Sequence, residues 1–243
     1  PQWEPPDTDT DGFDADGTRF HANGSTVHTH STARFAIRPH DKEQLMTDTL
    51  DASPRTQISR LTVPEIDALP DDLQRQIRSI ERQVGYIPNW VRAFALGGAH
   101  AARFNAYILG LLDPSSGLLP YPDRELIATV SSAENGCSYC RLNHAVSLGE
   151  ALGDKKLGTR IAVDYREVRE LTPRQRVLAD FAATLSARPN DISDNDLDSL
   201  RNLGLDDGAI YEAIEVVAAF AAANRFSIAL QVLSLIHISE PTR

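Results

Sequence analysis

Four side chains that could act together in catalysis fall within twenty residues of this 243-residue chain: Glu125, Cys137, Cys140 and His144. The two cysteines are the only ones in the protein, and two residues separate them. If the segment from Cys137 onward is helical, Cys137, Cys140 and His144 occupy positions i, i+3 and i+7 and share one face. The pattern predicts a redox-active dithiol with a general base beside it.

The chemistry of such a dithiol depends on forming a thiolate, because the thiolate is the species that attacks a peroxide or a disulfide. A helix N-terminus at Cys137 and Cys140 would favour negative charge there. His144, one turn beyond Cys140, would accept a proton, and Glu125 on the preceding helix would orient the imidazole. After attack on a peroxide, the sulfenic acid would condense with the second thiol to give a disulfide and water.

Other interpretations of a Cys-x-x-Cys pair are possible. A zinc site would need Cys137, Cys140, His144 and Glu125 as its four ligands, and carboxylates are uncommon in structural zinc sites. Covalent haem attachment needs a histidine directly after the second cysteine, where Arg141 stands. A thioredoxin-like site needs a preceding strand, and the preceding segment has a helical pattern. Besides a peroxidase, the open alternatives are a thiol-disulfide oxidoreductase or redox sensor, and a non-enzymatic metal-binding or oligomerisation module.

The composition of the chain indicates which kinds of partner and which cellular compartment to expect. The formal net charge is −10 and the pI is about 5.1, which argues against nucleic acid and anionic membranes as partners. We find no apolar run of about eighteen residues and no secretory signal, so no membrane span is expected. Two cysteines at dithiol spacing indicate a reducing compartment, and we expect the protein to be cytoplasmic.

The two ends of the chain differ from its middle. Residues 1–45 begin with a stretch rich in Asp, Pro, Thr and Gly, and we expect them to be disordered or a non-native segment upstream of Met46, the only methionine. Residues 233–243 resemble the translation of a sequencing-library adapter, so we expect them not to be native. The folded all-α domain is then predicted at residues 46–232.

The middle of the chain has helical periodicity and no persuasive strand alternation. Asp123, Thr172 and Ser193 are candidate N-caps. The helices are expected at about residues 73–84, 88–98, 100–112, 123–133, 137–151, 155–163, 174–186, 194–203 and 208–222. This order predicts an all-α bundle with the dithiol at the N-terminus of a central helix.

The spacing Glu-x11-Cys-x2-Cys-x3-His resembles the alkylhydroperoxidase AhpD-like branch of the carboxymuconolactone decarboxylase superfamily. The sequence of residues 137–145, CSYCRLNHA, is similar to that of the uncharacterised peroxidase-related subgroup. Residues 85–89, 171–175 and 224–225 add to the likeness, which covers about 62–232. It implies an AhpD-like helical bundle.

The resemblance also implies an activity and roles for the residues. It implies an alkylhydroperoxidase that needs no cofactor, with Cys140 attacking, Cys137 resolving, and His144 and Glu125 relaying the proton. Some members have a histidine between the cysteines, where this chain has Tyr139, so we expect a shorter relay and a slower reaction. Relatives form trimers or hexamers, so a homo-oligomer is expected, with a dithiol or a protein as reductant.

Three polar residues near the pattern remain to be placed. We expect Arg124 to lie on the surface, although contact with an acidic substrate is the alternative. Asn224 and Arg225 follow a long apolar segment and are candidates for lining the mouth of the active site.

Overall fold

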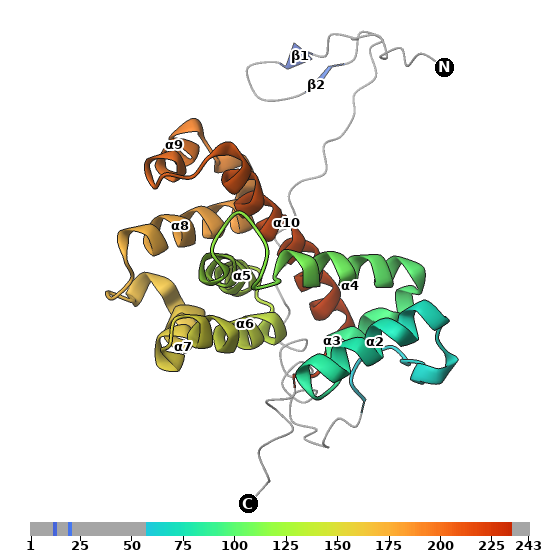
Figure 1. Ribbon diagram of the computed structural model, residues 1–243. Coiled ribbons are helices and arrows are strands. Elements are labelled where there is room, and N and C mark those ends of the chain that lie inside the picture. The colour runs from blue at the N-terminus through green and yellow to red at the C-terminus, as the bar shows by residue number, and fades with distance from the viewer. Residues whose placement is uncertain (1–11, 14–18, 21–56, 235–243) are drawn as a thin grey trace, which may run out of the picture. The chain divides into compact units, whose positions relative to one another are not determined.

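The computed structural model describes residues 12–13, 19–20 and 57–234 (Figure 1). Near the N-terminus, β1 (Gly12–Phe13) pairs with β2 (Arg19–Phe20) in an antiparallel ladder. This pair belongs to a separate compact unit from the helical part of the chain. Apart from these four residues, the prediction for residues 1–45 lies outside the described residues, as does most of the prediction for 233–243.

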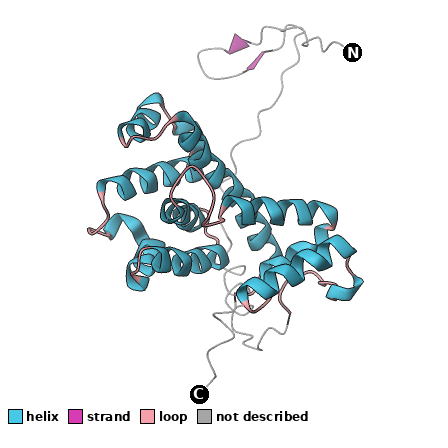
Figure 2. Cartoon of the chain, in the orientation of Figure 1, coloured by secondary structure: helices cyan, strands magenta, loops and turns pink. Residues whose placement is uncertain are grey.

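Residues 57–234 form a helical unit, which confirms the all-α prediction (Figures 1 and 2). The α-helices are α2 (Asp71–Val84), α3 (Asn89–Phe94), α4 (Ala99–Leu111), α5 (Tyr121–Glu134), α6 (Ser138–Ala151), α7 (Lys155–Asp164), α8 (Pro173–Ala187), α9 (Asp194–Asn202) and α10 (Asp207–Leu230). Short 3-10 turns are η1 (Ile66–Ala68), η2 (Ala95–Gly97), η3 (Tyr165–Glu167) and η4 (Pro189–Asp191).

Helix α5 is the centre of this unit. Figure 1 shows it end-on, with α6, α7, α8 and α10 around it. Residues 123–132 are all buried, so this helix has no solvent-facing stripe along that stretch. A helix that is covered all round needs partners on every side, and the main core cluster, which includes Leu126, Ile127 and Val130, supplies them.

The start of α5 differs from the prediction. We expected Asp123 to cap a helix beginning there, but the helix begins at Tyr121 and its N-cap is Pro120. Pro122 fits inside the first turn because backbone N–H groups at that point have no intrahelical partner. Asp123 instead forms an ion pair with Arg174 of α8, with 2.8 Å between the carboxylate and a guanidinium nitrogen.

Two other predicted caps are confirmed. The Thr172 hydroxyl accepts a hydrogen bond from the Gln175 N–H, and the Gln175 side chain accepts one from the Thr172 N–H. Ser193 forms the same reciprocal arrangement with Asp196. These capping boxes fix where α8 and α9 begin, which explains why local sequence located them.

Helix α10 is longer than predicted, because it continues past residue 222 to Leu230. By length and composition it could cross a membrane, which we had not expected of any segment. Its buried residues, however, belong to the same core cluster as those of α5 and α8. A polar residue inside it, Asn224, is fully buried, and such a position needs hydrogen-bond partners within the protein.

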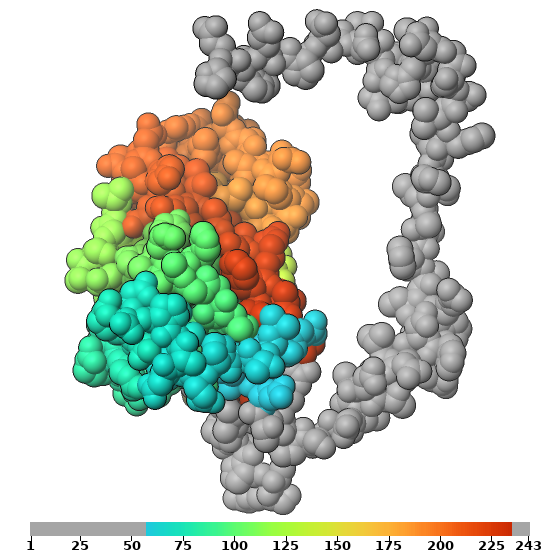
Figure 3. All heavy atoms as spheres, turned by 90° about the vertical axis from the view of Figure 1, so that its right-hand side faces the viewer, coloured from blue at the N-terminus to red at the C-terminus, as the bar shows by residue number. Residues whose placement is uncertain are grey.

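Helices α2, α3 and α4 form a smaller layer beside α10. Leu73, Ile77 and Val91 belong to a second core cluster between α2 and α3. Helices α4 and α10 lie side by side on the face seen in Figure 3, where the Tyr107 hydroxyl donates a 3.0 Å hydrogen bond to Glu215. Helix α10 contacts both α3 of this layer and the dithiol helix α6. Helices α3 and α6 also pack directly against each other in a third core cluster.

Candidate dithiol site

The local backbone places both cysteines at the N-terminus of α6, as predicted. Gly136 adopts a φ of 70° at the end of the α5–α6 turn, where a side chain would be strained. The Cys137 N–H then donates to the Ser132 carbonyl at 2.9 Å. Cys137 is the N-cap of α6, and its sulfur accepts a hydrogen bond from the Cys140 N–H at 3.4 Å.

The two thiols share their proton unequally. A hydrogen bond from the Cys140 thiol lowers the pKa of Cys137 to about 7, although burial opposes this, and the Cys140 backbone N–H also favours the charge. Donating that hydrogen bond raises the pKa of the Cys140 thiol far above its ordinary value, and burial raises it further. The reduced pair therefore carries its negative charge on Cys137 and its proton on Cys140.

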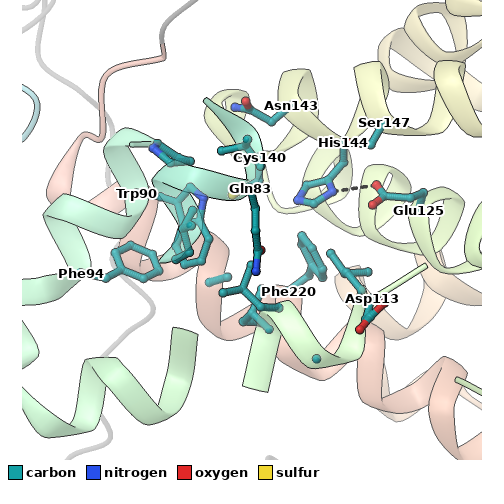
Figure 4. Close-up of a pocket in the computed structure, with 18 of the residues that line it drawn as sticks. Gln83, Trp90, Phe94, Asp113, Glu125, Cys140, Asn143, His144, Ser147 and Phe220 are labelled. Carbon is teal, nitrogen blue, oxygen red and sulfur yellow. Dashed lines mark hydrogen bonds and ion pairs between the residues drawn. The ribbon is translucent and has the colours of Figure 1, made fainter. Parts of the chain in front are cut away.

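His144 of α6 and Glu125 of α5 are joined by a hydrogen bond. Their hydrogen bond joins His144 Nδ1 to a Glu125 carboxylate oxygen at 2.8 Å (Figure 4). The imidazole also packs edge-on against Phe220, with 4.6 Å between ring centroids. Within residues 57–234 no hydrogen bond links the imidazole to either sulfur. A proton passing between them would need a water or substrate oxygen between the two groups.

Cys140 and His144 open into the same cavity. It has a volume of about 670 Å³ and lies between the α2–α4 layer and helices α5, α6 and α10. Cys137 is not among the residues that line it and is 1% exposed, whereas Cys140 lines it and is 7% exposed. A small molecule in the cavity therefore reaches Cys140 first.

Aromatic and aliphatic side chains form much of the cavity wall. Trp90 and Phe94, whose spacing indicated a core or subunit-interface face more than a substrate cage, pack edge-to-face with 5.6 Å between ring centroids. Both line the cavity beside the dithiol, and Phe94 also contacts the rings of Phe104 and Phe226. The wall suits the organic part of a substrate more than a fully hydrated ion.

Two tyrosines extend the site. Tyr121 lies close to Glu125, and burial followed by the nearby carboxylate raises the pKa of its phenol to about 12. Tyr139, between the cysteines, accepts a hydrogen bond from the Trp90 N–H at 3.3 Å. Burial raises the pKa of Tyr139 above its ordinary value, so it stays protonated at neutral pH. It can position neighbouring groups but cannot act as a base there.

Arg124 is not on the surface, as we had expected, but is 1% exposed. Its guanidinium donates hydrogen bonds to the carbonyl oxygens of Leu111 and Asp113, at 2.6 and 2.9 Å, and to that of Ser116. These acceptors lie at the C-terminal end of α4 and in the connection from α4 to α5, where the carbonyl groups have no intrahelical partner. Because Asp113 also lines the cavity, Arg124 holds one cavity wall in place.

Asn224 and Arg225, although adjacent in sequence, have different surroundings in the structure. Arg225 donates to the Ala221 carbonyl of its own helix at 2.6 Å and does not line the cavity. Asn224 is fully buried and does not line the cavity, whereas Ser227 lines it and has its hydroxyl 3.5 Å from the Cys140 sulfur. We had not predicted a role for Ser227. The available signal was a hydroxyl one turn after a polar residue in an otherwise apolar helix.

The zinc alternative has no ligand set in residues 57–234, where no group of three or more His, Cys, Asp or Glu side chains converges. The carboxylate of Glu125 is engaged with His144 instead.

Comparison with solved structures supplies relatives. A peroxidase-related protein of uncharacterised function from Silicibacter sp. TM1040 is 30% identical, with a TM-score of 0.68 over 75% of this chain and 94% of that one. An uncharacterised peroxidase-related protein from Ralstonia eutropha JMP134, described as an alkylhydroperoxidase AhpD core, is 29% identical, with a TM-score of 0.69 over 73% and 93%. The debrominase Bmp8, solved with 2,3,4-tribromopyrrole, shares the fold at 19% identity and a TM-score of 0.57 over 74% and 92%.

Neither a scan against protein-family models nor a search of curated proteins found a match. The fold and the site define a helical protein with a buried dithiol at a helix N-terminus and a histidine–carboxylate pair in the same cavity. With the two peroxidase-related relatives, this places the chain in a family: it belongs to the AhpD-like superfamily.

Proposed function

We propose that the protein is a peroxidase that reduces organic hydroperoxides with the Cys137–Cys140 dithiol. The observation that carries this proposal is the shared cavity, in which Cys140 and His144 face the same space of about 670 Å³. The nucleophile, the histidine and the carboxylate lie in the order that activation of a thiol requires. The space between Cys140 and His144 has room for the two oxygens of a hydroperoxide.

The reaction begins when Cys140 transfers its proton to Cys137 and attacks the outer peroxide oxygen. The O–O bond breaks, Cys140 becomes a sulfenic acid, and the departing alkoxide takes a proton from His144. His144 next accepts the Cys137 proton, and the Cys137 thiolate attacks the Cys140 sulfur. The S–O bond breaks, and the hydroxide leaves as water with the proton from His144. Two sulfurs are oxidised to a disulfide and the peroxide is reduced to an alcohol and water.

Glu125 keeps His144 in place through this cycle. Its carboxylate is buried and accepts the hydrogen bond from Nδ1, which leaves Nε2 as the ring nitrogen available to the reacting oxygens. A dithiol compound or a protein dithiol would then reduce the disulfide and return both thiols. We further propose that the protein acts in the cytoplasm as a homo-oligomer.

Single-turnover measurements on two variants test the proposal. In Cys137→Ser, one equivalent of cumene hydroperoxide should be consumed rapidly and a sulfenic acid should form at Cys140, without turnover. In Cys140→Ser, rapid consumption should be lost, because Cys137 does not line the cavity. Stopped-flow mixing and sulfenic-acid labelling measure both outcomes. Equal consumption by the two variants would overturn the assigned roles.

A thiol-disulfide oxidoreductase or redox sensor is the alternative that the same dithiol supports. It would exchange disulfides readily and turn over hydroperoxide no faster than a free thiol in solution. The cavity favours the peroxidase, because Cys140 opens into a space with apolar walls that suits a small organic molecule. Steady-state rates with cumene hydroperoxide and with a small disulfide separate the two activities.

A further inference from the structure

Two polar residues of α10 lie beside the dithiol, and one of them, Ser227, also lines the cavity. Asn224 and Ser227 are three residues apart and therefore share one helix face. Asn224 is fully buried and Ser227 is 3% exposed. Burying an amide and a hydroxyl in a helix of this composition is costly unless both are hydrogen-bonded. The hydrogen bonds of Asn224 and Ser227 therefore indicate the role of the two side chains.

The orientation of the Asn224 amide follows from its neighbours. Its Oδ1 accepts a hydrogen bond from the Asn135 side chain at 3.0 Å. Its Nδ2 donates to the hydroxyl of Ser132 at 3.1 Å, and the Ser132 carbonyl accepts the Cys137 N–H. Since the oxygen is already engaged on the Asn135 side, the second N–H of the amide is the group left to face the dithiol.

Ser227 touches the other sulfur. The Ser227 hydroxyl oxygen lies 3.5 Å from the Cys140 sulfur, within hydrogen-bond distance. Because the one proton of the Cys140 thiol is directed at Cys137, the hydroxyl keeps its own proton to donate to a thiolate. After the hydrogen bonds from Cys140 itself, the Asn224 and Ser227 side chains are the further groups that lower the pKa of Cys137, and both also act to lower the pKa of Cys140.

We propose that Asn224 and Ser227 stabilise the negative charge of the reduced dithiol, on Cys137 at rest and on Cys140 once its proton has passed to Cys137. The Ser227 hydroxyl lies within hydrogen-bond distance of the Cys140 sulfur, and the buried Asn224 amide has an N–H that its own partners leave free. This inference deepens the proposed function, because Cys140 must lose its proton before it attacks a peroxide.

Other ionisable groups near the dithiol do not explain this distribution of charge. Those on the surrounding elements are Tyr86 before α3, Arg92 of α3, Glu125 and Glu134 of α5, Tyr139, Arg141 and His144 of α6, and Arg225 of α10. Among residues 57–234, none of these forms a hydrogen bond with either sulfur. The sulfur contacts come from the N-terminus of α6 and from α10.

The test titrates the reduced protein in the absence of peroxide. Thiolate absorbance and the rate of alkylation by iodoacetamide are measured against pH for wild type, Ser227→Ala and Asn224→Leu. We expect the wild-type thiolate to titrate near pH 7. Each variant should titrate about one pH unit higher, which is roughly a fivefold smaller thiolate fraction at neutral pH. Ser227→Thr keeps the hydroxyl and should restore the wild-type titration.

Ser131→Ala is the matched control, because it removes a buried α5 hydroxyl that has no hydrogen-bond partner in the structure. Its titration should equal that of wild type. Ser227→Ala decides the question alone if Asn224→Leu does not fold. A Ser227→Ala protein that folds and titrates like wild type would overturn the proposal. Because no hydroperoxide is present, failure of the peroxidase assay and failure of this titration are independent results.

Discussion

At the level of residues, the site separates two properties that a single reactive cysteine usually combines. Cys137 carries the charge but is enclosed, whereas Cys140 faces the cavity but carries the proton. Reaction therefore requires proton movement within the pair before a sulfur–oxygen bond forms. A dithiol arranged in this way is protected from indiscriminate oxidation, since the sulfur that faces the cavity is not the charged one at rest.

The histidine–carboxylate pair should behave as one unit. We expect His144→Gln and Glu125→Gln each to lower kcat/KM for cumene hydroperoxide by about 100-fold, because either change removes proton transfer at one position. The double variant should be no slower than the slower single variant, as for groups that act together. Steady-state kinetics of the wild type, the two single variants and the double variant measure this coupling. Glu150→Gln changes an exposed carboxylate of α6 and should have no effect; multiplicative losses in the double variant would contradict the shared role.

The dithiol should also make stability depend on pH. The folded-state pKa of Cys137 is lowered from 9.0 to about 7, so its stabilising contribution is complete above about pH 9 and is lost as the pH falls towards 7. The change is about 2–3 kcal/mol. The raised pKa of Cys140 acts in the opposite direction above pH 9, where it weakens the fold.

Urea unfolding of the reduced protein between pH 6 and 10 measures this effect. The free energy of unfolding should rise from about pH 7 to a maximum near pH 9. In Cys137→Ser this rise should be absent, because the group that titrates is gone. A rise of equal size in Cys137→Ser would show that other groups cause the pH dependence.

At the level of elements, sequence was most informative where local hydrogen bonds decide the outcome. The capping boxes at Thr172 and Ser193 placed the starts of α8 and α9, and the i, i+3, i+7 spacing placed the dithiol at a helix N-terminus. Sequence failed where distant partners decide. Arg124 looked like a surface residue because nothing local reveals the loop carbonyls that it binds. Helix α10 was cut short in the prediction because the partners of Asn224 are about ninety residues away.

The close packing of α6 against α7 gives an element-scale prediction. An added Cβ at Gly158 of α7 would lie 2.3 Å from the Ala145 carbonyl oxygen and 2.7 Å from the Gly149 nitrogen. Both are backbone atoms of the dithiol helix and cannot move aside alone. We expect Gly158→Ala to destabilise the protein by about 1–3 kcal/mol, as overpacking of a close contact does, measured by urea unfolding.

Gly110 of α4 is the matched control, because it is also helical but an added Cβ there meets nothing within 4 Å. Gly110→Ala should leave stability unchanged or raise it by about 0.5–1 kcal/mol through helix propensity. A Gly158→Ala protein as stable as Gly110→Ala would mean that α7 can shift relative to α6 without cost.

At the level of the whole helical unit, the cavity exists only because segments far apart in sequence come together. Its walls come from α2 and α4 on one side and from α5, α6 and α10 on the other. The dithiol and its histidine could be found from sequence because Cys137, Cys140 and His144 lie in the first two turns of one helix. The cavity could not be found in this way, since no local pattern shows which faces of α2 and α10 will line it.

Cavity size predicts which hydroperoxides react well. A cumyl group would bury about 100 Å² or more of apolar surface against these walls, worth about 2–3 kcal/mol. We therefore expect kcat/KM for cumene hydroperoxide to exceed that for hydrogen peroxide by about 30- to 100-fold. Val84, at the C-terminal end of α2, lines the cavity and is 50% exposed, so it stands at the mouth. Val84→Trp should lower the rate with cumene hydroperoxide at least tenfold and leave the rate with hydrogen peroxide unchanged.

Val163→Trp supplies the comparison, because Val163 is 74% exposed on α7 and does not line the cavity. That variant should keep both rates and the wild-type preference. The ratio of the two rates is the decisive quantity, since a general loss of folded protein lowers both rates equally. If Val84→Trp lowers both in proportion, or if hydrogen peroxide is the better substrate of the unmodified protein, the cavity does not select the organic group. Substrate choice would then depend on the dithiol and the His144–Glu125 pair alone.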